Sequence, residues 1–255
     1  MSDYSVVMTF PTKYWDVYGS HSVPSFDKYW PKDINAYVYV EGEQNLPYKP
    51  SERVHLLNFD EHITGDKEFA EKYKDKDIFD DRVGGDISKR QAVKFSKKVF
   101  AQLEQLKNPT TRYVIYLDAD LATLKEVPLE LLSNLTQGNQ YVSFPDRRAR
   151  NKFTETGMMI WDTEHLFHKL WCKMYENMYK CGEIFECPEW HDCYAFDVPT
   201  FKLEKAGNIK CADLGYGVNS RHPLVAGPLG QYFDHMKGGR KFTGFSKERV
   251  QVHGK

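Results

Sequence analysis

Short apolar runs alternate with polar and amphipathic segments along most of the chain. Residues 5–10, 36–41 and 113–117 are apolar, aromatic and β-prone, and runs of this length indicate strands that are buried on both faces. Residues 88–106 instead place apolar side chains at steps of three and four, which is typical of an amphipathic helix. Strands and helices in this order predict a parallel sheet with crossover helices.

The remaining segments extend this alternation. Further strands are expected at 54–57, 141–144, 158–161 and 209–214, and further helices within 13–30, after Pro128, at 165–180 and from 188 onward. Residues 60–87 predict a surface connection with some helix, and the glycine-rich remainder after 214 predicts irregular structure. Because no repeat or linker divides the sequence, we expect one α/β domain over residues 1–255, with a mainly parallel central sheet flanked by helices.

Two carboxylates stand where the strand 113–117 ends. Asp118 and Asp120 flank Ala119, and residues two apart in a strand point to the same side. Such a pair is a hard-oxygen site for Mg²⁺ or Mn²⁺, and a divalent cation there can clamp a diphosphate. The alternative interpretation is a solvated junction between a strand and a loop.

Two other parts of the chain are candidates for ligand binding. Thr9 and Phe10 end the first strand, which is where a doubly wound sheet receives its ligand; the alternative is a plain strand end. Arg90, Lys94 and Lys98 project from the polar side of the amphipathic helix. They form either a solvated basic face or a face from which one cation reaches a phosphate.

A second motif lies far downstream of the carboxylate pair. His235, Gly238 and Lys241 have the spacing His-x-x-Gly-x-x-Lys. A neutral imidazole can ligate a metal, glycine lets the backbone approach a phosphate, and a lysine ammonium can pair with a diphosphate. The alternative is that Lys241 points into solvent, which leaves His253 as a second candidate for the third metal ligand.

Composition and charge bear on the possible partners and the cellular compartment of the protein. The net charge of −1 gives no global field for nucleic acid or membrane. No apolar stretch approaches the roughly 20 residues of a membrane span, and the N-terminus lacks the pattern of a signal peptide. Five cysteines are an odd number, for which free thiols in a reducing compartment are the default. We therefore expect a cytoplasmic protein without a transmembrane segment.

The order of these features resembles the nucleotide-sugar-dependent glycosyltransferases with the GT-A (Rossmann-like) fold. It is most similar to family 8, which includes glycogenin and the lipopolysaccharide galactosyltransferases. The features that carry the resemblance are the first strand, the basic helix, Tyr-Leu-Asp-Ala-Asp, a strand after Thr156-Gly157, the Trp-x-Asp segment at Trp190 and the C-terminal histidine. The resemblance implies a metal-dependent transfer, with retention, of a sugar from a UDP-sugar. The acceptor stays open: a glycan, a lipid-linked sugar, a protein or a modified nucleic acid.

The resemblance also implies roles for individual residues. Mn²⁺ (or Mg²⁺) would be held by Asp118, Asp120 and His235, with Ala119 beside the donor and Lys241 and the Gly238 backbone at its diphosphate. Thr9 would lie near the nucleobase with Phe10, one of Arg90, Lys94 and Lys98 near the diphosphate, and Glu155 and Asp192 in the sugar and acceptor pocket. One departure is that Cys193 follows Asp192, where family 8 usually has glutamine.

Other classes fit less well. A zinc site drawn from Cys172, Cys181, Cys187, His191 and Cys193 lacks a Cys-x-x-Cys pair. Aspartate-nucleophile phosphatases want threonine or valine where this chain has Ala122, and sugar nucleotidylyltransferases open with a glycine-rich loop that is missing after Thr9. The chief rival is a glycan- or nucleotide-binding module of the same fold without turnover.

Overall fold

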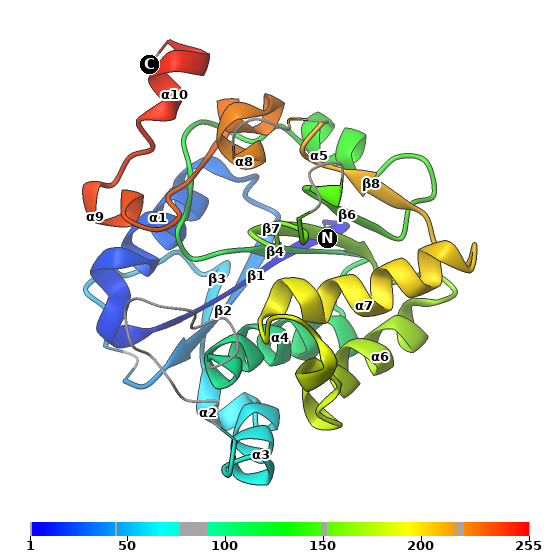
Figure 1. Cartoon of the computed structure of the whole chain (residues 1–255). Coiled ribbons are helices and arrows are strands. Elements are labelled where there is room, and N and C mark those ends of the chain that lie inside the picture. Colours follow the sequence, from blue (N-terminus) through cyan, green and yellow to red (C-terminus); the bar gives the residue numbers. More distant parts are fainter. Residues whose placement is uncertain are drawn as a thin grey trace.

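A seven-stranded sheet forms the centre of the molecule (Figure 1). The computed structural model describes residues 2–43, 45–76, 91–148, 152–216, 218 and 222–254, with the side chain of Lys241 outside this description. The strands of the sheet are β1 (Tyr4–Pro11), β2 (Asn35–Glu41), β3 (Val54–Asn58), β4 (Tyr113–Leu117), β6 (Val142–Phe144), β7 (Met158–Asp162) and β8 (Cys211–Asp213). They lie in the order β3-β2-β1-β4-β7-β6-β8.

Most neighbouring strands of this sheet are parallel. Strand β1 pairs in parallel with β2 and β4, β2 with β3, and β6 with β8. Strand β7 runs antiparallel to both β4 and β6. The predicted α/β class with a mainly parallel central sheet is therefore confirmed, with one reversed strand between its two parallel parts.

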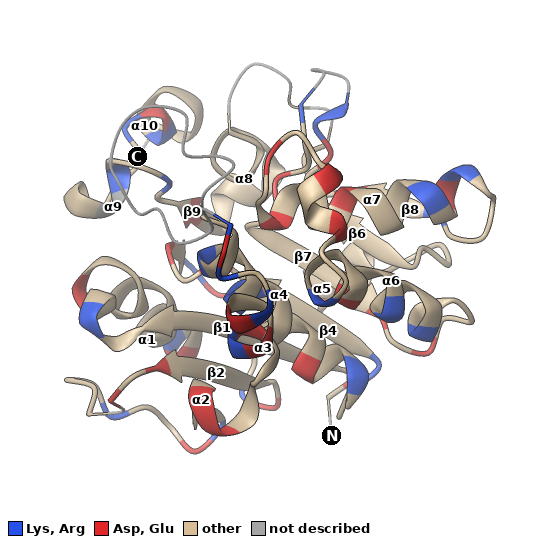
Figure 2. Cartoon of the chain, turned by 60° about the horizontal axis from the view of Figure 1, so that its bottom comes forward, with Lys and Arg blue, Asp and Glu red and all other residues tan. Residues whose placement is uncertain are grey.

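Helices cover both faces of the sheet (Figure 1). The longer ones are α1 (Gly19–Tyr29), α3 (Gly65–Lys72), α4 (Ala92–Lys107), α5 (Leu129–Leu135), α6 (His168–Lys180) and α7 (Asp192–Lys205). The shorter ones are η1 (Thr12–Val17), α2 (Phe59–His62), η3 (Glu183–Glu186), α8 (Pro223–Ala226), η4 (Pro228–Gln231), α9 (Arg240–Thr243) and α10 (Glu248–His253). None of the helices described here is long and apolar enough to cross a membrane. Basic and acidic residues are spread over most of these elements (Figure 2), in keeping with the small net charge.

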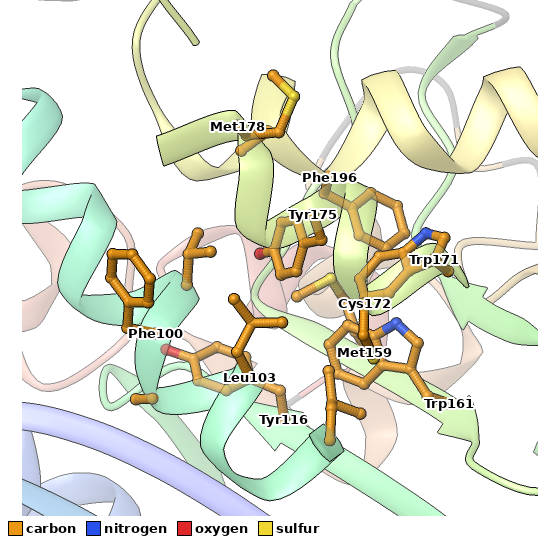
Figure 3. Packing of buried hydrophobic residues seen from close by; sticks show 14 of the residues in the cluster. Phe100, Leu103, Tyr116, Met159, Trp161, Trp171, Cys172, Tyr175, Met178 and Phe196 are labelled. Atoms are coloured by element: carbon orange, nitrogen blue, oxygen red, sulfur yellow. The ribbon is translucent and has the colours of Figure 1, made fainter. Parts of the chain in front are cut away.

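The strand side chains alternate between two apolar clusters. Val7 and Tyr116 pack on one face with α3, α4, α6 and α7, whereas Val6, Met8 and Ile115 pack on the other face with α1, α5 and α8. Figure 3 shows the first cluster, in which aromatic rings from the helices meet the sheet. Burying one such side chain contributes roughly 1.5–3 kcal/mol. The apolar runs at β1 and β4 are therefore continuous because both faces of these strands are covered.

A second, two-stranded sheet joins distant parts of the chain. Strand β5 (Leu121–Thr123) pairs antiparallel with β9 (Phe233–His235), so that Leu121 lies opposite His235. The expectation of irregular structure after residue 214 is wrong here, since β9 and several short helices occur in that region. Strands of three residues are too short to show a period of two in the sequence.

One buried acid in α7 predicts a pH-dependent stability. Asp197 is 8% exposed, and its Oδ2 accepts a hydrogen bond of 3.2 Å from the Thr154 N–H. Burial is the main cause that raises the pKa of Asp197 from 3.8 to about 6. A raised acid pKa means that folding favours the protonated form, so stability is fully present below pH 3.8 and is lost as the pH rises through 6.

Asp197→Asn removes this loss because the amide stays neutral. We expect Asp197→Asn to raise the free energy of unfolding, relative to the unmodified protein, by roughly 1–2 kcal/mol more at pH 8 than at pH 4.5. Urea unfolding of both proteins at the two pH values measures the difference. An identical difference at both pH values would show that Asp197 is ionised throughout.

Candidate functional site

The site lies at the carboxyl end of β4, where the small sheet begins. The Asp118 N–H donates to the Gly157 carbonyl (2.8 Å), and the Met236 N–H donates to the Asp120 carbonyl (2.9 Å). The backbone of the carboxylate pair is thus fixed on one side by the segment before β7 and on the other by the end of β9. This pairing carries His235 to the two carboxylates, although it lies 115 positions after Asp120.

The three predicted metal ligands converge. His235 Nε2 lies 3.0 Å from Asp120 Oδ1 and 3.5 Å from Asp118 Oδ2, and Asp120 and His235 are buried. Burial alone would lower the pKa of His235, but Asp120 and then Asp118 raise it to about 10. The ligand atoms of all three residues lie within 4.8 Å of one another. Two carboxylates and an imidazole at this spacing fit Mn²⁺ or Mg²⁺.

The other candidate ligand, His253, serves a different contact. Its Nε2 lies 2.8 Å from the Val225 carbonyl, in a contact between α10 and α8. Ala119 is buried between the two aspartates. Of the two C-terminal histidines, His235 is therefore the one that the fold brings to the carboxylate pair.

One lysine of the basic helix reaches the site, and it is engaged with carboxylates. Lys98 Nζ in α4 lies 2.7 Å from Asp118 Oδ1 and 2.8 Å from Asp192 Oδ2, and it donates to the Thr156 carbonyl (3.0 Å). Burial would lower the pKa of Lys98, but Asp118 and Asp192 together hold it well above its ordinary value. Lys94 is exposed with its ammonium over the Phe95 ring. Arg90 lies outside the described residues.

Asp192 is a buried residue of the site and contacts Lys98. It begins α7, is 4% exposed, and accepts a hydrogen bond from the Thr156 hydroxyl. Burial acts to raise the pKa of Asp192, but Lys98 holds it below its ordinary value. Burial raises the pKa of the adjacent Cys193 thiol well above its usual range. Cys172, Cys181, Cys187, Cys193 and Cys211 are all free thiols.

Glu155 is the most enclosed acid of the site, at 1% exposed. Its carboxylate lies 3.0 Å from Lys237 Nζ, 3.4 Å from an Arg147 guanidinium nitrogen and 3.3 Å from His222 Nε2. Burial would raise the pKa of Glu155, but His222, Lys237 and His235 hold it well below its usual range. The sequence analysis did not identify these partners. Lys237 lies between His235 and Gly238 of the C-terminal motif, Arg147 belongs to the Arg147-Arg148 pair after β6, and no motif includes His222.

The donor-side positions differ in what they offer. Thr9 Oγ1 is buried with no hydrogen-bond partner among the described residues. Phe10 is part of the core, with its ring 5.8 Å from that of Trp15. Gly238 has a φ of +68°, a left-handed conformation that glycine adopts without strain. Lys241 lies in α9.

The comparisons with known proteins identify the fold. No family model and no curated protein matches the sequence. Among solved structures, the galactosyltransferase LgtC in complex with donor and acceptor sugar analogs is similar over 97% of this chain and 94% of its own, with 16% identity and a TM-score of 0.53. The bifunctional glycosyltransferase WbbM is similar over 98% of this chain, with 10% identity and a TM-score of 0.54. The fold is that of the GT-A glycosyltransferases.

Some similar structures are much longer than this chain. The glycosyltransferase GlyE of Streptococcus pneumoniae is similar over 84% of this chain, with 12% identity and a TM-score of 0.49. This chain spans 46% of the length of GlyE and 51% of the length of WbbM. At these identities the likeness concerns the fold alone.

Proposed function

We propose that the chain is a metal-dependent glycosyltransferase that moves a sugar from a UDP-sugar to an acceptor, with retention, and that residues 1–255 form one GT-A domain. One observation carries the proposal: Asp118, Asp120 and His235 converge at the carboxyl end of β4, the edge at which an open α/β sheet receives its ligand. Passive binding of a nucleotide does not need such a site, whereas a cation held there can neutralise the charge on a departing diphosphate.

The proposal gives each candidate residue a separate role. Asp118, Asp120 and His235 would hold Mn²⁺ or Mg²⁺, and the bound cation would supply positive charge to a departing diphosphate. The Lys241 ammonium and the Gly238 backbone N–H bind the diphosphate oxygens. The Thr9 hydroxyl, which has no hydrogen-bond partner among the described residues, would contact the nucleobase. Asp192 and Glu155 would line the sugar and acceptor pocket.

Lys98 has a supporting part in this scheme. Its ammonium neutralises Asp118 and Asp192 at 2.7 and 2.8 Å, so that the two carboxylates stay ionised next to one another. We therefore assign it to the orientation of Asp118 toward the metal rather than to the diphosphate.

The test is a turnover screen of UDP-, GDP- and dTDP-sugars with and without Mn²⁺. We expect UDP release that requires Mn²⁺ and that EDTA abolishes. Isothermal titration with Mn²⁺ present should show tighter binding of UDP than of GDP or CMP. A preference for GDP would move the proposal to a mannosyl- or fucosyltransferase, and tight UDP binding without turnover of any donor would make the protein a binding module.

A further inference from the structure

A cluster of charges around the buried Glu155 carboxylate lies next to the proposed metal ligands. Glu155 receives Lys237 Nζ at 3.0 and 3.2 Å to its two oxygens, and its Oε1 lies 3.9 Å from His235 Nδ1. The His222 ring stands perpendicular to the His235 ring, with centroids 4.7 Å apart. The cluster therefore touches His235 on the side opposite Asp118 and Asp120.

A second metal in this cluster is disfavoured. The ligand atoms of Glu155, His222 and His235 lie within 4.8 Å of one another, a spacing that can hold an ion. However, Lys237 and Arg147 already place two positive charges on the same carboxylate, at 3.0 and 3.4 Å. A third cation would meet like charges at short range in a buried setting, where they are poorly screened.

The two nitrogens of His235 face different groups. Nε2 faces the aspartates, at 3.0 and 3.5 Å. Nδ1 is buried and has no hydrogen-bond partner among the described residues. An imidazole that ligates a metal through Nε2 carries its proton on Nδ1. A buried N–H without an acceptor costs roughly 1–3 kcal/mol.

Glycine at position 157 confines the ring. A Cβ built on Gly157 would stand 2.4 Å from His235 Cε1 and 2.7 Å from Nδ1. The edge of the ring that carries Nδ1 thus lies against the backbone two residues after Glu155. Nδ1 lies 3.9 Å from Glu155 Oε1. A relative movement of about 1 Å between the ring and the carboxylate would shorten this distance to hydrogen-bond length.

We propose that Glu155 is a positioning residue of the metal centre, which accepts the Nδ1–H of His235 and so fixes the ring with Nε2 toward the metal. Arg147 and Lys237 contact the same carboxylate, at 3.4 and 3.0 Å. The inference rests on the proposed metal site, and it adds a role to Glu155 beyond lining a sugar pocket. Carboxylates behind metal-bound imidazoles typically change metal affinity by 10–100-fold.

The test measures Mn²⁺ binding by isothermal titration without donor. We expect Glu155→Met to bind Mn²⁺ about 10–100-fold more weakly than the unmodified protein, and Glu155→Gln, which keeps an acceptor oxygen, to fall between them. The matched control is Lys237→Met, which breaks the ion pair but leaves the carboxylate beside His235. It should bind Mn²⁺ within about threefold of the unmodified protein, because its effect on the ring is indirect.

A second readout does not depend on the stability of a variant. Nitrogen-15 spectra of the histidine side chains, recorded with Mg²⁺ bound, should show His235 protonated at Nδ1, with a slowly exchanging proton. Equal Mn²⁺ affinity of Glu155→Met and the unmodified protein, equal losses in Glu155→Met and Lys237→Met, or a proton on Nε2 would each overturn the inference while the proposed function stands. An unmodified protein that binds no Mn²⁺ would overturn both.

Discussion

Replacing His235 or Asp120 with alanine is expected to reduce nucleotide-sugar turnover to the rate measured without metal. Each variant removes one of the three proposed metal ligands, whose ligand atoms lie within 4.8 Å of one another. A bound cation stabilises a departing diphosphate by several kcal/mol, so the loss is about 10³-fold or larger. Initial rates over a range of Mn²⁺ concentrations measure it, with circular dichroism to show that each variant is folded.

The chain offers a matched control for the histidine. His253→Ala removes another C-terminal imidazole, whose Nε2 contacts the Val225 carbonyl at 2.8 Å. This variant should keep its dependence on Mn²⁺. Full activity in His235→Ala would refute the assignment of the third ligand and with it the proposed role of β9.

The largest loss of stability is expected from Lys98→Met. The Lys98 side chain is 13% exposed and lies within 2.8 Å of both Asp118 and Asp192. Its removal leaves the buried Asp192 carboxylate and the partly buried Asp118 carboxylate without their shared cation. Breaking a buried ion pair by removing one partner costs roughly 3–5 kcal/mol, and urea unfolding at pH 7 measures this difference in the free energy of unfolding.

A variant of the neighbouring Lys97 tests whether the cost of losing Lys98 comes from burial or from loss of charge alone. Lys97 forms an ion pair with Glu41 at 2.5 Å, and its side chain is 31% exposed. Because more exposed pairs are screened by water, Lys97→Met should cost less than about 1 kcal/mol. Adding Asp192→Asn to Lys98→Met should recover part of the loss, since one uncompensated charge disappears. Equal costs for the two lysine variants would show that Lys98 is solvated.

Local pattern was enough to predict much of the frame. The apolar runs that became β1 and β4 are buried on both faces by two clusters, and their continuity in the sequence shows this directly. The helix expected over 88–106 is observed as α4, from Ala92 to Lys107. Asp118 and Asp120 follow β4, as a ligand-binding pair at a strand end should.

Contacts between side chains that lie far apart in the sequence could not be predicted. The period of α4 shows which side of the helix is polar, but not which lysine on that side meets the aspartates, because this depends on how the helix sits on the sheet. Likewise Glu155 gathers Arg147, His222 and Lys237 from three separate segments. No spacing rule connects such residues, and only the fold brings their charges together.

The pairing of β5 with β9 has a consequence for how the protein matures during translation. The acidic pair leaves the ribosome 115 residues ahead of its imidazole, which at 5–20 residues per second is a delay of roughly 6 to 23 s. During this interval Lys98, which is synthesised before either aspartate, is available to neutralise Asp118. A nascent chain that ends before β9 therefore lacks one member of the proposed triad, and tight uptake of a metal ion would report that β9 has docked.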